Sequence, residues 1–305
     1  MVDASTEPGP DVLGPLHRID NPRDPRLDLY RDLNDPAHRF RLEMDRSVFM
    51  VEGRLAVERL LASNYTGRSL LVDDRQVVAA APVVAAARAR GVPVYVCSRA
   101  VVAETVGFAF HRGVVAVADR PRPIDSGQLL ATVGSGSREV PGLVAILEGL
   151  NDHENLGALF RNAAAFGVTG VLLDPTCADP LYRRSVRVSV GHVLHVPFAR
   201  VEPWPSGLGQ LRAAGFAVVA LAPRPPDGNQ GRHANLTDLR AVLPRDDVPV
   251  AVLLGAEGPG LTRAALALAD VVVSIPMAAG VDSINVATAA ALAFHTLAHV
   301  RRSDR

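Results

Sequence analysis

Three polar segments in the second half of the chain carry the side chains that could do chemistry. They span residues 148–157, 254–261 and 275–287. The glycines of the middle segment allow its backbone to approach a ligand closely. None of the three contains a GxGxxG, GxxxxGK[S/T] or GxSxG motif, so a dinucleotide dehydrogenase, a P-loop nucleotide hydrolase and a serine hydrolase are not supported.

The third segment places Asp282, Ser283 and Asn285 at the start of a stretch that is otherwise Ala, Val and Leu. Ser283 could serve as the N-cap of a helix that begins here. Asn285 would then lie inside the first helical turn, where asparagine carries a small propensity cost. A helix cap therefore explains only one of the two side chains.

A lone arginine follows the first segment. Arg161 is the only charged residue between Leu156 and Leu173. A guanidinium in such an apolar run must reach water, a carboxylate or a ligand. Three interpretations stay open: exposure to water, an ion pair with Glu257 of the second segment, or contact with a ligand.

The elements that must position these residues alternate between strand and helix. Strands are predicted over 143–147, 170–173, 193–196, 217–221, 248–254 and 271–275, and helices over 156–166, 180–189, 208–214, 261–268 and 284–300. Continuous apolar strands, each followed by a helix, indicate a parallel sheet buried on both faces. Ligands bind such sheets beyond the carboxyl ends of the strands, which is where the three polar segments lie.

The first half of the chain predicts a second, smaller α/β domain. Its strands are expected over 49–51, 69–72, 92–96 and 114–117, with helices over 54–62, 83–90 and from residue 98. Residues 1–35 are rich in Pro, Asp and Arg and predict an extended arm with one short helix after Pro25. The predicted organisation is an arm over 1–35, a small domain over 36–120, a Pro, Gly and Ser rich linker over 121–141, and a larger domain over 142–305.

Composition narrows the possible partners. The 305 residues include 32 basic and 32 acidic side chains, so no global field attracts the protein to nucleic acid or an anionic surface. The low-charge stretch 271–281 is about half the length needed to span a bilayer, and residues 1–35 lack the apolar core of a signal peptide. A cytoplasmic protein is expected. Cys97 and Cys177 lie far apart without a CxxC motif, and no metal site is predicted.

Taken together, the three segments resemble the signature motifs of the SpoU (TrmH) branch of the SPOUT RNA methyltransferases. The similarity rests on Asn155-Leu156-Gly157 with Arg161, on residues 255–261, and on residues 275–277 with 283–287. It covers residues 143–300. Residues 51–118 resemble the small RNA substrate-binding domain of the same family, whose fold is like that of certain ribosomal proteins.

The resemblance implies an α/β fold whose C-terminal parallel sheet is threaded into a deep trefoil knot, and a knot that forms the S-adenosylmethionine pocket. By resemblance, the residues expected to contact the cofactor are Gly255, Ile275, Met277 and Ile284. Those expected to form the catalytic cluster are Asn155, Arg161, Glu257, Ser283 and Asn285. Two positions depart from the usual pattern: Ile284 stands where leucine is common, and His153-Glu154 stand where small residues or proline are common.

The reaction implied is methyl transfer to a ribose 2′-hydroxyl. Arg161 stays protonated, so we expect it to stabilise the developing alkoxide and hold the adjacent phosphate, while Asn155 and the third segment fix the geometry. RNA contacts are expected from local arginines, namely Arg54 and Arg112 in the small domain and Arg183, Arg184 and Arg187 near the catalytic segments. A homodimer paired through the last helix is expected by resemblance, although an Ala-rich helix could equally pack inside its own domain.

Several alternatives remain at this point. Ribosomal RNA is favoured as the substrate over transfer RNA, because a separate RNA-binding domain suits a large folded target. A catalytically silent RNA-binding protein that assists ribosome assembly is a second possibility, and the joint presence of the five catalytic candidates argues against it. An α/β enzyme with another adenosine cofactor would need a phosphate-binding loop, and the sequence offers none.

Overall fold

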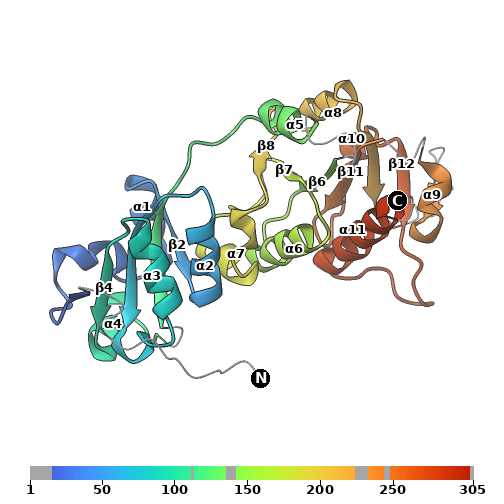
Figure 1. The fold of residues 1–305 in the computed structure, drawn as a ribbon. Helices are drawn as coiled ribbons and strands as arrows, with labels where there is room; N and C mark the ends of the chain where they lie inside the picture. The colour runs from blue at the N-terminus through green and yellow to red at the C-terminus, as the bar shows by residue number, and fades with distance from the viewer. Residues whose placement is uncertain (1–15, 111–112, 135–141, 224–232, 244–247, 303–305) are drawn as a thin grey trace, which may run out of the picture. The chain divides into compact units, whose positions relative to one another are not determined.

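The computed structural model describes residues 16–110, 113–134, 142–223, 233–243 and 248–302. The chain divides into two compact units, Met1–Pro121 and Arg122–Arg305. Each unit contains one β-sheet with helices against it (Figure 1).

The first unit is built on a five-stranded mixed sheet in the order β1-β4-β3-β5-β2. Its strands are β1 (His17–Arg18), β2 (Val48–Glu52), β3 (Gly67–Asp73), β4 (Val94–Cys97) and β5 (Val114–Asp119). β3 pairs in parallel with β4 and antiparallel with β5, while β2 pairs antiparallel with β5. β2 is buried along its whole length, which explains why its sequence is a nearly continuous apolar run.

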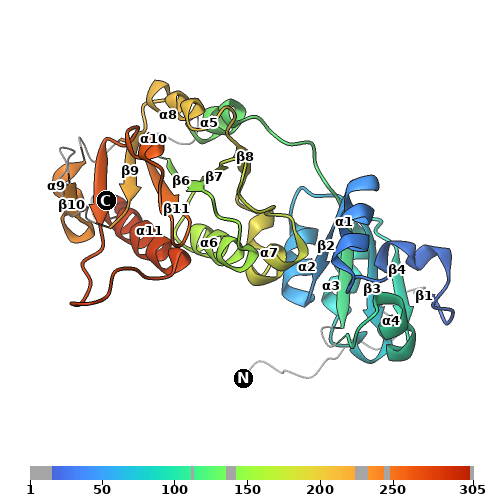
Figure 2. The same ribbon diagram turned by 180° about the vertical axis from the view of Figure 1, so that it is seen from behind.

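Helices cover both faces of this sheet (Figure 2). They are η2 (Pro25–Tyr30), α1 (Pro36–Asp45), α2 (Arg54–Ala62), η3 (Asp74–Gln76), α3 (Ala81–Ala89) and α4 (Arg99–Val106). α2 and α3 pack against each other and against the strands. η2 and α4 share a core with Met50, Leu71 and Val115 of the sheet.

The prediction of an extended arm is wrong for the described residues 16–35. Ile19, Leu27, Tyr30 and Leu33 are buried in the core of the first unit. β1 also adds to the sheet beside β4, and the short helix expected after Pro25 is η2. The apolar residues of this segment are too widely spaced to give a period, so the sequence alone did not reveal their burial. Residues 1–15 lie outside the described part of the chain.

The second unit contains a seven-stranded sheet in the order β10-β12-β9-β11-β6-β7-β8. Its strands are β6 (Leu143–Glu148), β7 (Gly170–Leu173), β8 (Phe198–Arg200), β9 (Ala217–Leu221), β10 (His233–Asn235), β11 (Val250–Gly255) and β12 (Val271–Ser274). Every neighbouring pair is parallel, as the sequence predicted. The carboxyl ends of the strands therefore meet at one edge of the sheet.

Helices form a layer on each face of this sheet (Figures 1 and 2). They are α5 (Ser126–Gly134), α6 (His153–Ala165), α7 (Arg183–Val188), η4 (His192–Leu194), η5 (Ser206–Leu208), α8 (Gly209–Ala213), η6 (Leu236–Asp238), α9 (Leu239–Val242), α10 (Arg263–Leu266) and α11 (Val286–Arg302). α6 packs against both α7 and α11 on one face. α5, α8 and α10 contribute Leu129, Leu211 and Ala265 to the core on the other face.

The structure corrects the predicted linker over 121–141. Residues 126–134 form α5, which packs against β7 and β8 within the second unit. Its residues Leu129, Leu130 and Val133 are buried in the core. The surrounding Pro, Gly and Ser residues obscured this short apolar period, and residues 135–141 lie outside the described part of the chain.

Other predicted elements also differ from the structure in kind or in bounds, and three examples follow. The strand expected over 193–196 is replaced by η4 and the later strand β8, because positive φ angles at Val190 and Gly191 turn the chain into η4. The helix expected over 180–189 is the shorter α7. The last helix, expected from residue 284, begins at Val286 as α11.

No helix in the described ranges is long and apolar enough to cross a membrane. Over the same residues, no group of three or more His, Cys, Asp and Glu side chains is arranged to hold a metal ion.

Candidate active site

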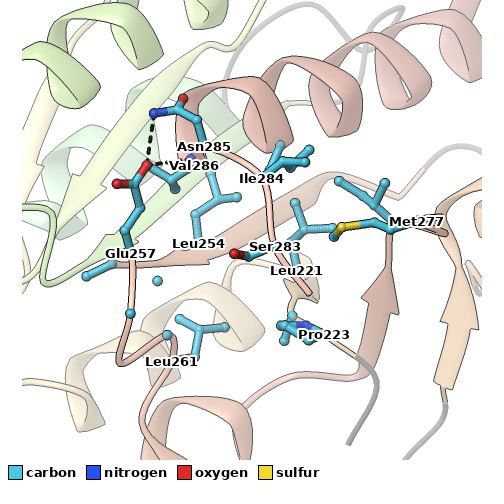
Figure 3. Close-up of a pocket in the computed structure, with 17 residues that line it drawn as sticks. Leu221, Pro223, Leu254, Glu257, Leu261, Met277, Ser283, Ile284, Asn285 and Val286 are labelled. Atoms are coloured by element: carbon cyan, nitrogen blue, oxygen red, sulfur yellow. Dashed lines mark hydrogen bonds between the residues drawn. The ribbon is translucent and has the colours of Figure 1, made fainter. Parts of the chain in front are cut away.

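A cavity of about 490 Å³ opens at the carboxyl ends of β9, β11 and β12 in the second unit (Figure 3). This is the sheet edge at which the sequence predicted ligand binding. The cavity is lined by Leu221, Ala222, Pro223, Leu254, Gly255, Ala256, Glu257, Gly258, Gly260, Leu261, Ile275, Met277, Ser283, Ile284, Asn285, Val286 and Ala289. Two of the three polar segments thus meet across one space.

The loop after β11, residues 255–262, is a tight turn that needs its glycines. Gly258 and Gly260 have φ angles of +87° and +67°, a region that glycine occupies without steric cost. The amide of Gly260 donates to the carbonyl of Ala256 at 3.0 Å, which closes the turn. A Cβ added to Gly255 would lie 2.4 Å from the carbonyl carbon of Gly260. Only glycine at position 255 therefore allows the loop to fold back against itself.

All four predicted cofactor residues line the cavity. Gly255 comes from the end of β11, Ile275 and Met277 follow β12, and Ile284 precedes α11. Ile275, Met277 and Ile284 are each half-buried, so part of their apolar surface faces the open space. In Figure 3, Met277 and Ile284 lie on the side of the cavity opposite Glu257.

Three of the predicted catalytic residues form a hydrogen-bonded cluster. The side-chain nitrogen Nδ2 of Asn285 donates to Asn155 Oδ1 at 2.7 Å and to Glu257 Oε1 at 2.9 Å. Glu257 Oε1 also accepts the backbone amide of Val286 at 3.2 Å. The cluster therefore connects the start of α6, the loop after β11 and the start of α11.

Asn285 is the N-cap of α11, which corrects its predicted place inside the first helical turn. Its Oδ1 accepts the backbone amides of Ala287 and Thr288 at 3.0 and 3.2 Å. The side chain thus satisfies unpaired amides at the helix start and still directs its nitrogen towards the cluster. Ser283, the alternative cap candidate, lies two residues before it, and its hydroxyl points into the cavity in Figure 3.

Asn155 reaches the cluster because of the way α6 begins. Asp152 is the N-cap of α6 and accepts the amides of Glu154 and Asn155 at 2.9 and 2.8 Å. This cap starts the helix immediately after the loop that follows β6. Asn155 therefore lies in the first turn, at the carboxyl edge of the sheet.

Arg161 does not join the cluster. Six residues separate it from Asn155 on α6, a spacing that places it about 9 Å further along the helix and about 120° around its axis. Its side chain is exposed, it does not line the cavity, and among the described residues it makes no ion pair. The ion-pair interpretation with Glu257 is therefore wrong, since Glu257 bonds to Asn285 instead.

The arginines predicted to contact RNA are found in different settings. Arg184 of α7 pairs with Glu154 of α6, and its Nε and Nη2 lie 2.9 and 2.5 Å from one carboxylate oxygen. Arg183 and Arg187 on the same helix are half-buried. We call these three residues together with Arg161 the arginine surface of the second unit.

In the first unit, Arg54 lies near Glu58 one helical turn away and donates to the carbonyl of Ala79 at 3.1 Å. It is therefore partly engaged with its own unit. Arg112 lies outside the described residues.

Sequence reasoning missed some residues of the site. Leu221, Ala222 and Pro223 line the cavity from the end of β9, and Ala289 lines it from the first turn of α11. The rule that ligands bind beyond the carboxyl ends of strands applied to β9 as well. Positions 221–223 carry no polar residue, so the sequence contained no chemical signal for a binding site there.

The chemistry that the site offers is binding and orientation. Among the described residues that line the cavity there is no His, Cys or Arg, and the polar side chains are Glu257, Ser283 and Asn285. Among these lining residues, no hydroxyl or thiol is therefore paired with a histidine base. A reactive small molecule held in the cavity could instead meet a second substrate at its polar side.

Comparisons with known proteins agree with this geometry. Residues 142–295 match the model of the SpoU rRNA Methylase family, and residues 50–124 match the model described as RNA 2'-O ribose methyltransferase substrate binding. An uncharacterized tRNA/rRNA methyltransferase of Mycobacterium tuberculosis is 44% identical over 297 residues, covering 97% of this chain and 96% of that protein. The 23S rRNA (guanosine-2'-O-)-methyltransferase RlmB of Shewanella oneidensis is 30% identical over 76% of this chain and 89% of its own length.

Solved structures share the fold over nearly the whole chain. The AdoMet-bound rRNA methyltransferase from Sinorhizobium meliloti superposes with a TM-score of 0.73 at 24% identity, over 92% of this chain and 97% of that one. The SpoU methyltransferase AviRb from Streptomyces viridochromogenes, in complex with AdoMet, gives a TM-score of 0.70 at 24% identity, over 93% and 100% of the two chains. With its family models, its relatives and its fold in agreement, the chain belongs to the SpoU rRNA methylase family and is an RNA methyltransferase.

Proposed function

We propose that this protein transfers a methyl group from S-adenosylmethionine to a ribose 2′-hydroxyl of ribosomal RNA. The observation that carries the proposal is the cavity at the carboxyl ends of β9, β11 and β12, with the Asn155, Glu257 and Asn285 cluster at its polar side. The match to the model described as RNA 2'-O ribose methyltransferase substrate binding and the relative named 23S rRNA (guanosine-2'-O-)-methyltransferase support the choice of atom and RNA.

The residues present fit S-adenosylmethionine. A volume of about 490 Å³ lies in the range of small-molecule sites. Leu221, Leu254 and Ile275 provide apolar walls suited to an adenine ring, and the crowded backbone at Gly255 leaves amide and carbonyl groups close to the space. Once bound, the cofactor supplies an electrophilic methyl group on its sulfonium.

The polar side chains would orient the acceptor hydroxyl. Asn285 is fixed by its capping bonds and by both members of the cluster, so it loses little freedom when RNA binds. Ser283 and Glu257 both line the cavity, so their side chains can hydrogen-bond the incoming ribose. The hydroxyl must lose its proton as the new bond forms, and Glu257 is the carboxylate in the cluster that can accept a hydrogen bond from it.

Arg161 would act on the RNA and not on the cofactor. Its exposed guanidinium can hold the phosphate next to the target ribose and stabilise developing negative charge on the oxygen. We propose a homodimer formed through α11, whose Leu292 is 43% exposed while Ala290, Ala293 and Phe294 are buried within the unit. α6 packs beside α11, so such a dimer would bring Arg161 close to the second copy.

A trefoil knot in the second unit and a cytoplasmic location are also part of the proposal. The knot rests on the family resemblance, and the strand order β12-β9-β11-β6 is compatible with it. Tracing residues 217–302 in an experimental structure would test the knot. Light scattering at micromolar concentration would test the dimer, which a monomer with intact activity would refute.

The central test is methylation of RNA with labelled S-adenosylmethionine, followed by mapping of the modified nucleotide. We expect label in ribosomal RNA at a ribose 2′-oxygen, detected as resistance of the adjacent bond to alkaline cleavage. Label on a base would refute the proposed atom, and label in transfer RNA alone would refute the proposed substrate.

A further inference from the structure

A buried carboxylate next to the cavity has no part in the mechanism described so far. Glu148 is the last residue of β6 and is only 5% exposed. It pairs in register with Gly255, the residue at which the loop after β11 begins. Its position is therefore the junction between the first two polar segments.

Both oxygens of Glu148 are occupied by hydrogen bonds. Oε2 accepts the backbone amide of Thr262 at 2.8 Å, and Oε1 accepts the Thr262 hydroxyl at 2.8 Å. Oε1 also accepts the indole N–H of Trp204 at 2.8 Å. Three donors from two separate segments thus converge on a single carboxylate.

Thr262 is the residue at which the loop after β11 ends. Its hydroxyl accepts the amide of Ala265 at 3.2 Å and so caps α10 while it donates to Glu148. The preceding residue, Leu261, lines the cavity and packs on the core together with Trp204. Glu148 therefore lies beside the start of the loop and bonds to its end.

We propose that Glu148 is a positioning residue that holds the loop 255–262 in its cofactor-binding conformation. The inference rests on the proposed function, because it takes S-adenosylmethionine as the ligand of this loop. A carboxylate is required by the hydrogen-bond inventory, since all three groups that face it are donors.

A glutamine at position 148 cannot replace these bonds. Its amide nitrogen would face either the Thr262 amide or the Trp204 indole, and in both orientations two donors meet. One end of the loop would then lose its acceptor. The expected consequence is a loop that samples other conformations and binds the cofactor more weakly.

The first test compares Glu148→Gln with Asp174→Asn by calorimetric titration of S-adenosylmethionine into the full-length protein. Asp174 is a matched control because it is also buried, at 4% exposure, and follows the neighbouring strand β7. It accepts the amides of Gly149, Thr176 and Cys177 and, among the described residues, makes no hydrogen bond to the loop 255–262.

We expect Glu148→Gln to raise the Kd for S-adenosylmethionine at least tenfold, equivalent to about 1.4 kcal/mol, with the binding stoichiometry unchanged. In steady-state assays the KM for S-adenosylmethionine should rise while kcat and the KM for RNA change less than threefold. Asp174→Asn should leave the cofactor Kd within twofold. Equal cofactor affinity in Glu148→Gln and wild type would overturn the inference.

A second measurement separates the inference from the proposed function. Amide hydrogen exchange in the ligand-free protein should accelerate over residues 255–262 in Glu148→Gln and stay unchanged there in Asp174→Asn. Thr262→Ser keeps both donors and should behave as wild type, whereas Thr262→Val should exchange faster. If wild type binds no S-adenosylmethionine, the proposed function fails, and unchanged exchange in Glu148→Gln would independently refute the positioning role.

Discussion

The cavity and the arginine surface of the second unit are built by different means. The cavity is assembled from neighbouring loops at one sheet edge, and its polar side chains are fixed to one another by hydrogen bonds. The arginine surface is spread over α6 and α7, with Arg161 unpaired among the described residues and Arg184 paired to Glu154. The protein thus carries a preformed small-molecule site, whereas the proposed RNA contacts of the arginine surface would be completed by the RNA or by a second copy.

The largest effect is expected from Arg161→Ala, which removes the guanidinium that α6 contributes to the arginine surface and leaves the cavity intact. Methyl transfer should fall at least a hundredfold, about 2.7 kcal/mol of barrier, while the Kd for S-adenosylmethionine stays within twofold. Single-turnover kinetics and calorimetry measure the two quantities. Turnover within tenfold of wild type would show that Arg161 is a surface charge without a role in the reaction.

The roles of the two asparagines in the cluster can be separated by comparing Asn155→Ala with Asn285→Ala. Both changes break the bond between the two amides, so both should lower kcat by roughly ten- to a hundredfold, about 1.4 to 2.7 kcal/mol. Only Asn285 caps α11, so only its replacement should cost about 1 kcal/mol of stability. Thermal unfolding checks the second point, and equal destabilisation by both variants would contradict the assigned cap.

Gly255→Ala should weaken cofactor binding without affecting RNA. The new Cβ would collide with the backbone at Gly260, and the loop would have to shift. We expect a rise of about tenfold in the Kd for S-adenosylmethionine, about 1.4 kcal/mol, measured by calorimetry. Gly209→Ala is the matched control, since its Cβ would meet nothing within 4 Å, and a similar loss there would indicate a general effect of added methyl groups.

The smallest effects concern the ion pair on the arginine surface. Exposed pairs contribute roughly 0 to 1 kcal/mol, so Glu154→Gln should change stability little while it frees Arg184. If Arg184 holds phosphate, the KM for RNA should fall two- to threefold in Glu154→Gln and rise by a similar factor in Arg184→Ala. Changes in the same direction for both variants would argue against a phosphate contact.

The same contrast explains what the sequence could and could not predict. The cavity residues were identifiable because parallel strands bring their carboxyl ends to one edge, and motif spacing marks the loops that follow. The predicted start of the last helix was wrong by two residues, because an asparagine after a serine gives two candidate caps and only the tertiary bonds of Asn285 decide between them.

Longer-range relations were not predictable. The helical period of α6 indicated that Arg161 and Asn155 lie on different sides of the helix. It did not indicate which groups would face the Arg161 side chain. Glu148 was the first residue of a polar segment and had no predicted role, because its donors come from residues 204 and 262, far away in the sequence. Burial of Leu129 and Leu130 in α5 was hidden by a composition typical of linkers.

The position of Trp204 has a further consequence. The chain contains a single tryptophan. All of its intrinsic tryptophan fluorescence, which lies at longer wavelength than tyrosine fluorescence, therefore comes from one indole. That indole is half-buried and bonded to the carboxylate that also holds Thr262. The wavelength and intensity of the emission therefore report on the polarity at the end of the loop 255–262, and the protein carries its own optical probe without any added label.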